Sequence, residues 1–152
     1  MRRHFSSSIV RREISSQVEL NGMKITSAEG DQSKGGLNQQ HQTQNRNLPT
    51  ILFLHGLLGQ SRMWRNFALN DAISRERDVY LVDLRNHGES DHHQSMTYEE
   101  MAGDVARFAE SRGLASYTLI GHNLGAKTAM MTATLYPEQV NGVICLDTAP
   151  TG

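Results

Sequence analysis

Four short apolar runs alternate with longer helical segments, and this alternation constrains the fold more than any other feature. The runs cover residues 51–54, 79–82, 117–120 and 143–146. Each is nearly continuous in apolar residues and too short for a helix, which is typical of strands buried on both faces of a parallel sheet. Helical spacing over 61–74, after the capping residue Thr97 and over 125–136 fills the gaps between the runs. The sequence therefore predicts an α/β fold with a mostly parallel sheet built from βαβ units.

The first 48 residues differ from the rest. Apolar residues alternate around Asn21 and Gly22 in the segment 18–25, which predicts an N-terminal β-hairpin. Residues 29–48 are polar and rich in Gln and Asn, so we expect a disordered loop there. Residues 1–12 contain four Arg and three Ser and no acidic residue. This composition predicts a mitochondrial transit peptide, which places the protein in the matrix, ahead of a partial domain over 13–152. The alternative is a basic tail without an address, in a cytoplasmic protein.

Composition excludes several classes of protein. The formal net charge is −1, so the chain has no basic footprint for nucleic acid. No apolar run approaches the roughly 18 residues of a transmembrane segment. The single cysteine, Cys145, rules out a disulfide framework, and its apolar neighbours predict a buried, inert thiol.

One pentapeptide carries the strongest functional signal. Gly121-His122-Asn123-Leu124-Gly125 follows an apolar strand and opens a helix. The frame is that of the Gly-x-Ser-x-Gly nucleophile elbow, with Asn123 at the position of the serine. We expect Asn123 to have a positive φ, which asparagine tolerates better than most residues. An amide has no readily ionised proton and is a poor nucleophile, so the motif predicts the shape of the elbow without its chemistry.

Four motifs in this order resemble the N-terminal half of an α/β-hydrolase. They are His55-Gly56-Leu57-Leu58-Gly59, Asp83-Leu84-Arg85-Asn86-His87-Gly88-Glu89-Ser90, the pentapeptide around Asn123, and Leu146-Asp147. Residues 85–88 and 127–130 are most similar to mitochondrial α/β-hydrolase-domain esterases and small bacterial esterases. The resemblance spans about residues 15–150 and implies a hydrolase sheet that is truncated after the sixth family strand.

The resemblance also implies roles for particular residues. The backbone N–H groups of Leu57 and Leu124 correspond to the oxyanion hole, which stabilises the charge that develops on a reacting carbonyl oxygen. His55 and Gly56 belong to the oxyanion loop, and Gly121, His122 and Gly125 shape the elbow. Asp147 ends the fourth strand, where it is either the triad acid or, as we favour, a structural residue of the loop. In this family the triad histidine comes last, and no histidine follows Asn123 in the sequence.

These features support one main hypothesis and two alternatives. The chain is predicted to descend from enzymes that hydrolyse carboxylic esters or thioesters and to be inactive itself; an unusual mechanism and an irregular gene model remain open explanations of Asn123. One alternative is a non-catalytic binding or assembly subunit in mitochondria, with a protein partner covering the edge strand from Val143 to Leu146. The other is a truncated or divergent gene copy. A small ester or thioester is the expected ligand, and no cofactor is expected.

No metal site is expected either. His87, His92 and His93 lie near Asp91 in the sequence. Their spacing does not match a metal-binding motif, so we interpret them as part of a solvated loop.

Overall fold

The computed structural model describes residues 18–25 and 49–148. Within these ranges the chain forms a five-stranded sheet in the order β1-β3-β2-β4-β5. The strands are β1 (Gly22–Ile25), β2 (Thr50–Leu54), β3 (Asp78–Val82), β4 (Tyr117–His122) and β5 (Val140–Leu146). β1 is antiparallel to β3, and the other neighbouring strands are parallel. The predicted α/β fold with a mostly parallel sheet is therefore confirmed.

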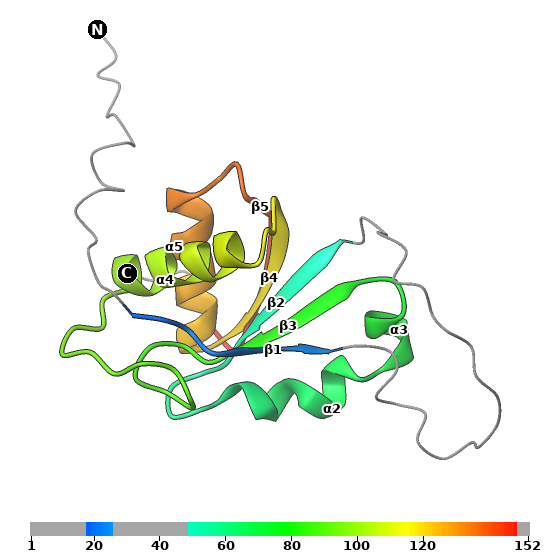
Figure 1. The fold of residues 1–152 in the computed structure, drawn as a ribbon, viewed down its shortest axis with the longest axis horizontal. Coiled ribbons are helices and arrows are strands. Elements are labelled where there is room, and N and C mark those ends of the chain that lie inside the picture. The colour runs from blue at the N-terminus through cyan, green and yellow to red at the C-terminus, as the bar shows by residue number, and fades with distance from the viewer. Residues whose placement is uncertain (1–17, 26–48, 149–152) are drawn as a thin grey trace, which may run out of the picture.

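Helices cover both faces of the sheet (Figure 1). α4 (Tyr98–Ser111) and α5 (Leu124–Leu135) pack against each other on one face. The 3₁₀-helix η2 (Ser61–Trp64) and the short helices α2 (Arg65–Ala68) and α3 (Asp71–Ser74) lie on the other. α4 starts with a capping box in which Thr97 and Glu100 each bond the other's backbone, as the sequence predicts for Thr97.

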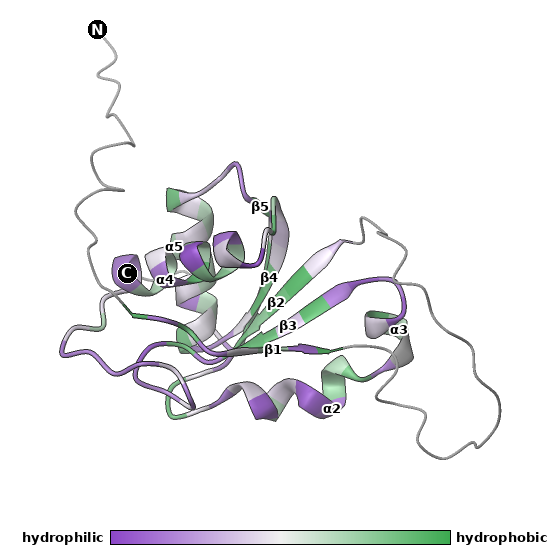
Figure 2. Ribbon diagram, in the orientation of Figure 1, coloured by the Kyte–Doolittle hydropathy of each residue, from purple (hydrophilic) through white to green (hydrophobic). Residues whose placement is uncertain are grey.

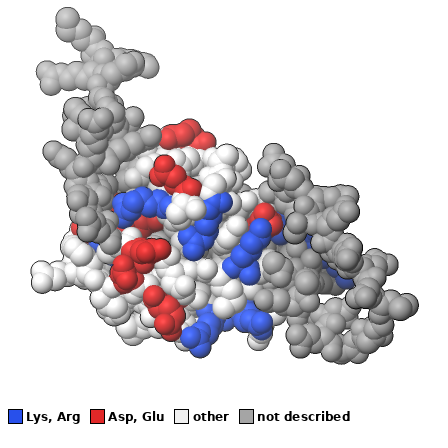
Figure 3. All heavy atoms as spheres, in the orientation of Figure 1, with Lys and Arg blue, Asp and Glu red and all other residues white. Residues whose placement is uncertain are grey.

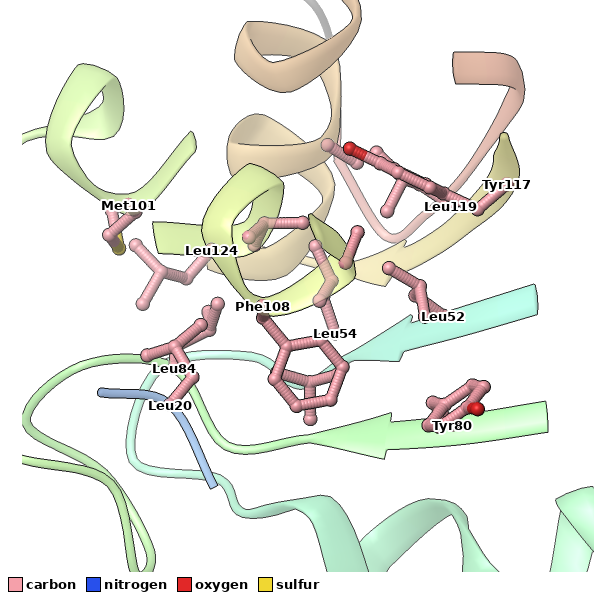
Figure 4. Close-up of a cluster of buried hydrophobic side chains, with 14 of the residues drawn as sticks. Leu20, Leu52, Leu54, Tyr80, Leu84, Met101, Phe108, Tyr117, Leu119 and Leu124 are labelled. Atoms are coloured by element: carbon pink, nitrogen blue, oxygen red, sulfur yellow. The ribbon is translucent and has the colours of Figure 1, made fainter. Parts of the chain in front are cut away.

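Side chains of β2 and β3 alternate between two hydrophobic clusters, one on each face of the sheet. Leu52 and Leu54 of β2 pack in the larger cluster under α4 and α5 (Figure 4). Ile51 and Phe53 pack in the smaller cluster, against Trp64. The hydropathy of these strands follows from burial on both faces (Figure 2). The two neighbouring strands thus form a rigid base whose carboxyl ends support the loops of the site.

The predicted N-terminal hairpin is wrong, although an antiparallel strand does lie at the sheet edge. Only Gly22–Ile25 forms a strand, and it pairs with β3. The preceding residues bond instead to the loop after β3, where the Asn21 carbonyl accepts from the Asp83 N–H and the Asn21 N–H donates to Ser90 Oγ at 2.8 Å. Val18 and Leu20 are buried in the larger cluster. Tertiary burial outweighs the local preference of Asn-Gly for a tight hairpin.

Two further expectations need correction. Residues 61–74 form three short helical segments instead of one helix, and the Asn70 side-chain oxygen accepts from the Ala72 N–H at 3.0 Å where the chain turns between the last two. Cys145 is exposed rather than buried, because β5 is an edge strand whose carboxyl-terminal half is open to solvent. The calls on residues 1–12 and 29–48 lie outside the described residues. No helix within 18–25 and 49–148 is long and apolar enough to cross a membrane.

Candidate functional site

The pentapeptide around Asn123 forms a tight turn between β4 and α5. Asn123 has φ 48° and ψ −109°, in the positive-φ region that the sequence predicts. Its neighbours must be glycine, because a Cβ on Gly121 would lie 2.4 Å from the Gly125 backbone and a Cβ on Gly125 would lie 2.5 Å from the Leu54 carbonyl oxygen. The Asn123 N–H donates to the Leu146 carbonyl at 3.0 Å, which ties the turn to β5. The turn therefore has the strained backbone of an elbow.

The Asn123 side chain caps the helix that follows it. Its Oδ1 accepts a hydrogen bond from the Leu124 N–H at 2.8 Å. The first N–H groups of a helix have no partner within the helix, so a side-chain acceptor here stabilises the start of α5. The same N–H group is the one that the sequence assigns to oxyanion binding. In this structure the amide of Asn123 occupies it.

The loop after β2 lies directly against this turn. A Cβ on Gly56 would lie 2.5 Å from His122 Nδ1 and 3.3 Å from Asn123 Cβ, so only glycine fits between loop and turn. Leu57 is exposed, and Leu58 has φ 60°. The structure thus brings together the two segments that the sequence predicts to form one site.

His55 and His87 join this loop to the loop after β3 through reciprocal hydrogen bonds. Nε2 of His55 accepts from the Leu84 N–H at 3.0 Å, and Nε2 of His87 accepts from the Leu58 N–H at 3.3 Å. Each Nδ1 contacts a backbone carbonyl at 2.8 Å, of Gly56 and Arg85 respectively. Both rings are therefore neutral and carry the proton on Nδ1. Burial lowers the pKa of His55, the nearby His87 lowers it further, and the bond to Gly56 only partly opposes this.

A family model for the alpha/beta hydrolase fold matches residues 49–151. This chain belongs to the α/β-hydrolase family. An abhydrolase domain-containing protein of Schizosaccharomyces pombe is 39% identical over 102 residues, which are 67% of this chain and 38% of that protein. The sn-1-specific diacylglycerol lipase ABHD11 of Mus musculus is 38% identical over 105 residues, 69% of this chain and 34% of that protein. Ethanol acetyltransferase 1 of Kluyveromyces marxianus is 38% identical over 100 residues, 66% of this chain and 28% of that protein.

Solved structures agree with this assignment. A marine microorganism esterase superposes with a TM-score of 0.71 and 33% identity, and the match covers 88% of this chain and 43% of the esterase. The α/β-hydrolase chain thus spans about a third of the length of the curated relatives above and less than half of that esterase.

Asp147 of this α/β-hydrolase lies beside His122 rather than in a hydrogen bond to it. Its Oδ2 is 3.6 Å from His122 Nε2, and its side chain is 83% exposed. The backbone of Asp147 has φ 51°. The carboxylate follows β5 directly, next to the strand residue that holds the Asn123 N–H.

Two buried charged residues organise the loop after β3, and the sequence analysis gave neither a role. Asp83 accepts from the Ser61 N–H at 2.5 Å and the Glu89 N–H at 3.1 Å. Burial alone raises the pKa of Asp83, but these hydrogen bonds outweigh it and hold the pKa below its usual value. Arg85 is fully buried and bonds both carboxylate oxygens of Asp104 at 2.5 and 2.9 Å. A charged residue directly after an apolar strand was the available signal.

A pocket of about 190 Å³ opens beside the elbow. It is lined by His55, Gly56, Met63, Trp64 and His122, which come from the loop after β2, from η2 and from the end of β4. Within the described part of the chain, no group of three or more His, Cys, Asp or Glu residues could hold a metal ion. His93 instead makes local bonds, with its N–H donating to Asn86 Oδ1 and its Nδ1 accepting from Ser95.

Proposed function

We propose that this α/β-hydrolase chain keeps the architecture of an ester- or thioester-hydrolysing site but does not hydrolyse. The hydrogen bond from the Leu124 N–H to Asn123 Oδ1 at 2.8 Å carries the proposal. It unites two losses in one residue. The position of the nucleophile holds an amide, and the amide oxygen occupies a backbone donor that the family uses for the developing oxyanion.

The neighbouring histidines are poorly placed to replace this chemistry. Both ring nitrogens of His55 and of His87 are engaged with backbone groups. A general base needs a free nitrogen within hydrogen-bond reach of the group it deprotonates. His122 points its Nε2 toward Asp147, at 3.6 Å.

The ancestral reaction is acyl chemistry. The names of the similar proteins include an esterase, a lipase and acetyltransferases. These reactions all place a carbonyl carbon at the elbow and a developing oxyanion at the backbone donors. We propose that this chain inherited the scaffold for such a carbonyl group and lost the step that attacks it.

Hydrolysis of p-nitrophenyl acetate by the purified chain tests the proposal. We expect no turnover above that of a heat-denatured sample, and the same for Asn123→Ala. Saturable hydrolysis that disappears in Asn123→Ala would contradict the proposal, because it would make Asn123 part of a working site.

A second candidate is a non-catalytic subunit of a mitochondrial complex. The observation in its favour is β5, where Ile144 and Leu146 are 49% and 39% exposed. Exposed apolar edge strands invite pairing with another chain. Size-exclusion chromatography of a mitochondrial extract tests this candidate. Elution of the endogenous protein at the size of the purified chain would contradict it.

A further inference from the structure

The pocket beside the elbow has a distinct chemical character. None of its five lining residues is acidic, lysine or arginine. His55 has both ring nitrogens bonded to the backbone, so it offers the pocket only its carbon surface. Met63 and Trp64 supply apolar wall, and the remaining polar group is the half-exposed imidazole of His122. A neutral, largely apolar molecule suits such a wall better than an ion, since burying an unpaired charge is costly.

Trp64 adds one unfilled hydrogen-bonding position. Its Nε1 is the single buried side-chain nitrogen or oxygen without a partner among the residues that the structure describes. Buried indole N–H groups usually find an acceptor. The Trp64 side chain as a whole is only partly buried, so the indole has room to turn toward an oxygen in the pocket. An unsatisfied donor in the wall of an apolar pocket favours a ligand that carries one acceptor.

The size of the pocket limits the ligand further. A volume of about 190 Å³ is below the roughly 300–1,000 Å³ that is usual for drug-sized ligands. On the face of the molecule that Figure 3 shows, acidic and basic side chains are interspersed rather than gathered in one field. Shape and the single acceptor therefore select the ligand, rather than long-range attraction.

We propose that this pocket binds small neutral molecules with a short apolar chain and one carbonyl or hydroxyl oxygen, which accepts from Trp64 Nε1. The inference rests on the proposed function in one respect only: the site holds such a molecule without reacting with it. Because a ketone cannot be hydrolysed, binding can be measured separately from any esterase activity.

Trp64 is the only tryptophan of the chain, so intrinsic fluorescence reports on this pocket alone. Titration with 2-hexanone should give a saturable change with half-saturation on the order of 1 mM, as expected for so small a ligand. Hexanoate has the same chain length and a negative charge, and it should bind at least tenfold more weakly. A response that does not saturate, or equal binding of hexanoate, would overturn the proposal.

Two exposed methionines provide a matched pair of variants. Met63 lines the pocket and is 67% exposed, whereas Met96 is 37% exposed and is not among the lining residues. Met63→Ala should weaken 2-hexanone binding about threefold or more through lost apolar contact, and Met96→Ala should leave binding unchanged. Equal effects of both substitutions would place the ligand elsewhere.

The role of the indole N–H is tested by ligand-observed NMR. The alkene 2-methyl-1-hexene has the shape of 2-hexanone without its oxygen, so it should bind more weakly to the wild type. In Trp64→Phe the difference between the two ligands should disappear. If the ketone keeps its advantage in this variant, Trp64 is not its donor and that part of the proposal fails. Ester hydrolysis by the wild type together with normal ketone binding would refute only the proposed lack of catalysis.

Discussion

Asn123 Oδ1 accepts a hydrogen bond from the Leu124 N–H at 2.8 Å, at the turn where β4 passes into α5. The bond explains how the elbow keeps its shape with an amide at its tip. Asparagine tolerates the positive φ, and its side chain satisfies an N–H group that the helix itself cannot. The residue that removes the nucleophile is thus well suited to the local backbone.

Restoring the serine should not restore the enzyme. Asn123→Ser frees the Leu124 N–H but supplies no base, because both ring nitrogens of His55 and of His87 are engaged. We expect esterase activity to stay at background. The check is labelling by a fluorophosphonate probe. Reaction of the new serine at the rate of an ordinary serine esterase would show that some histidine does reach the elbow.

The buried Arg85 should matter far more for stability than an exposed arginine in the same region. Arg85→Ala leaves the buried carboxylate of Asp104 without its bidentate partner, at a cost of about 3–5 kcal/mol in the free energy of unfolding. Arg62 pairs with Glu89 at 3.5 Å on the surface, and Arg62→Ala should cost about 0–1 kcal/mol. Urea denaturation measures both. Similar costs would contradict this view of the loop after β3.

Stability should fall in mild acid because of His55. The pKa of His55 is lowered in the folded protein, so the unfolded chain takes up the proton first as the pH falls. The contribution to stability is complete above about pH 6.5, the unfolded pKa, and is lost as the pH falls through the folded pKa. His55→Gln should flatten this part of the pH profile, although the variant is less stable overall. His92→Gln, at an exposed position, is the control and should leave the slope unchanged.

Asp83 adds a second, more acidic step. Its pKa lies below the model value of 3.8 in the folded protein, so its contribution is complete above that pH and disappears below it. Thermal melts between pH 3 and pH 8 resolve the two steps. A profile without any loss of stability below pH 6.5 in the wild type would refute the role given to His55.

The strands and the elbow could be predicted from the sequence because their signals are local. The apolar run in β2 and the glycines around Asn123 each carry their own physical reason. The hairpin prediction failed because Asn21 bonds to the loop after β3, a contact 62 residues away that no local pattern encodes. The exposure of Cys145 depends on the place of β5 in the sheet order, which apolar composition does not reveal.

The same distinction holds within the site. Asn123 stands out in the sequence because it breaks a motif. The reciprocal bonds of His55 and His87 could not be predicted, because their partners are backbone groups on two loops that meet only in the folded chain. The pocket beside Trp64 likewise needs η2 to pack against the end of β4.

The N-terminal segment should act as a mitochondrial address. A fusion of residues 1–30 to a fluorescent reporter should localise to mitochondria, because residues 1–12 are rich in Arg and Ser and contain no acid. Replacing Arg2, Arg3, Arg11 and Arg12 with glutamate is the matched control and should abolish import. A diffuse cytosolic signal from the unaltered fusion would argue against the address.

The central claim, that the Asn123 amide occupies the Leu124 donor, can be observed directly by NMR. In labelled protein, a scalar coupling across the hydrogen bond should connect the Leu124 backbone nitrogen with the Asn123 side-chain carbonyl carbon. The Leu124 amide proton should also be protected from exchange in the wild type and in Asn123→Asp, which keeps an acceptor, and lose that protection in Asn123→Ala. Absence of the coupling, together with an amide that exchanges equally fast in all three proteins, would contradict the account.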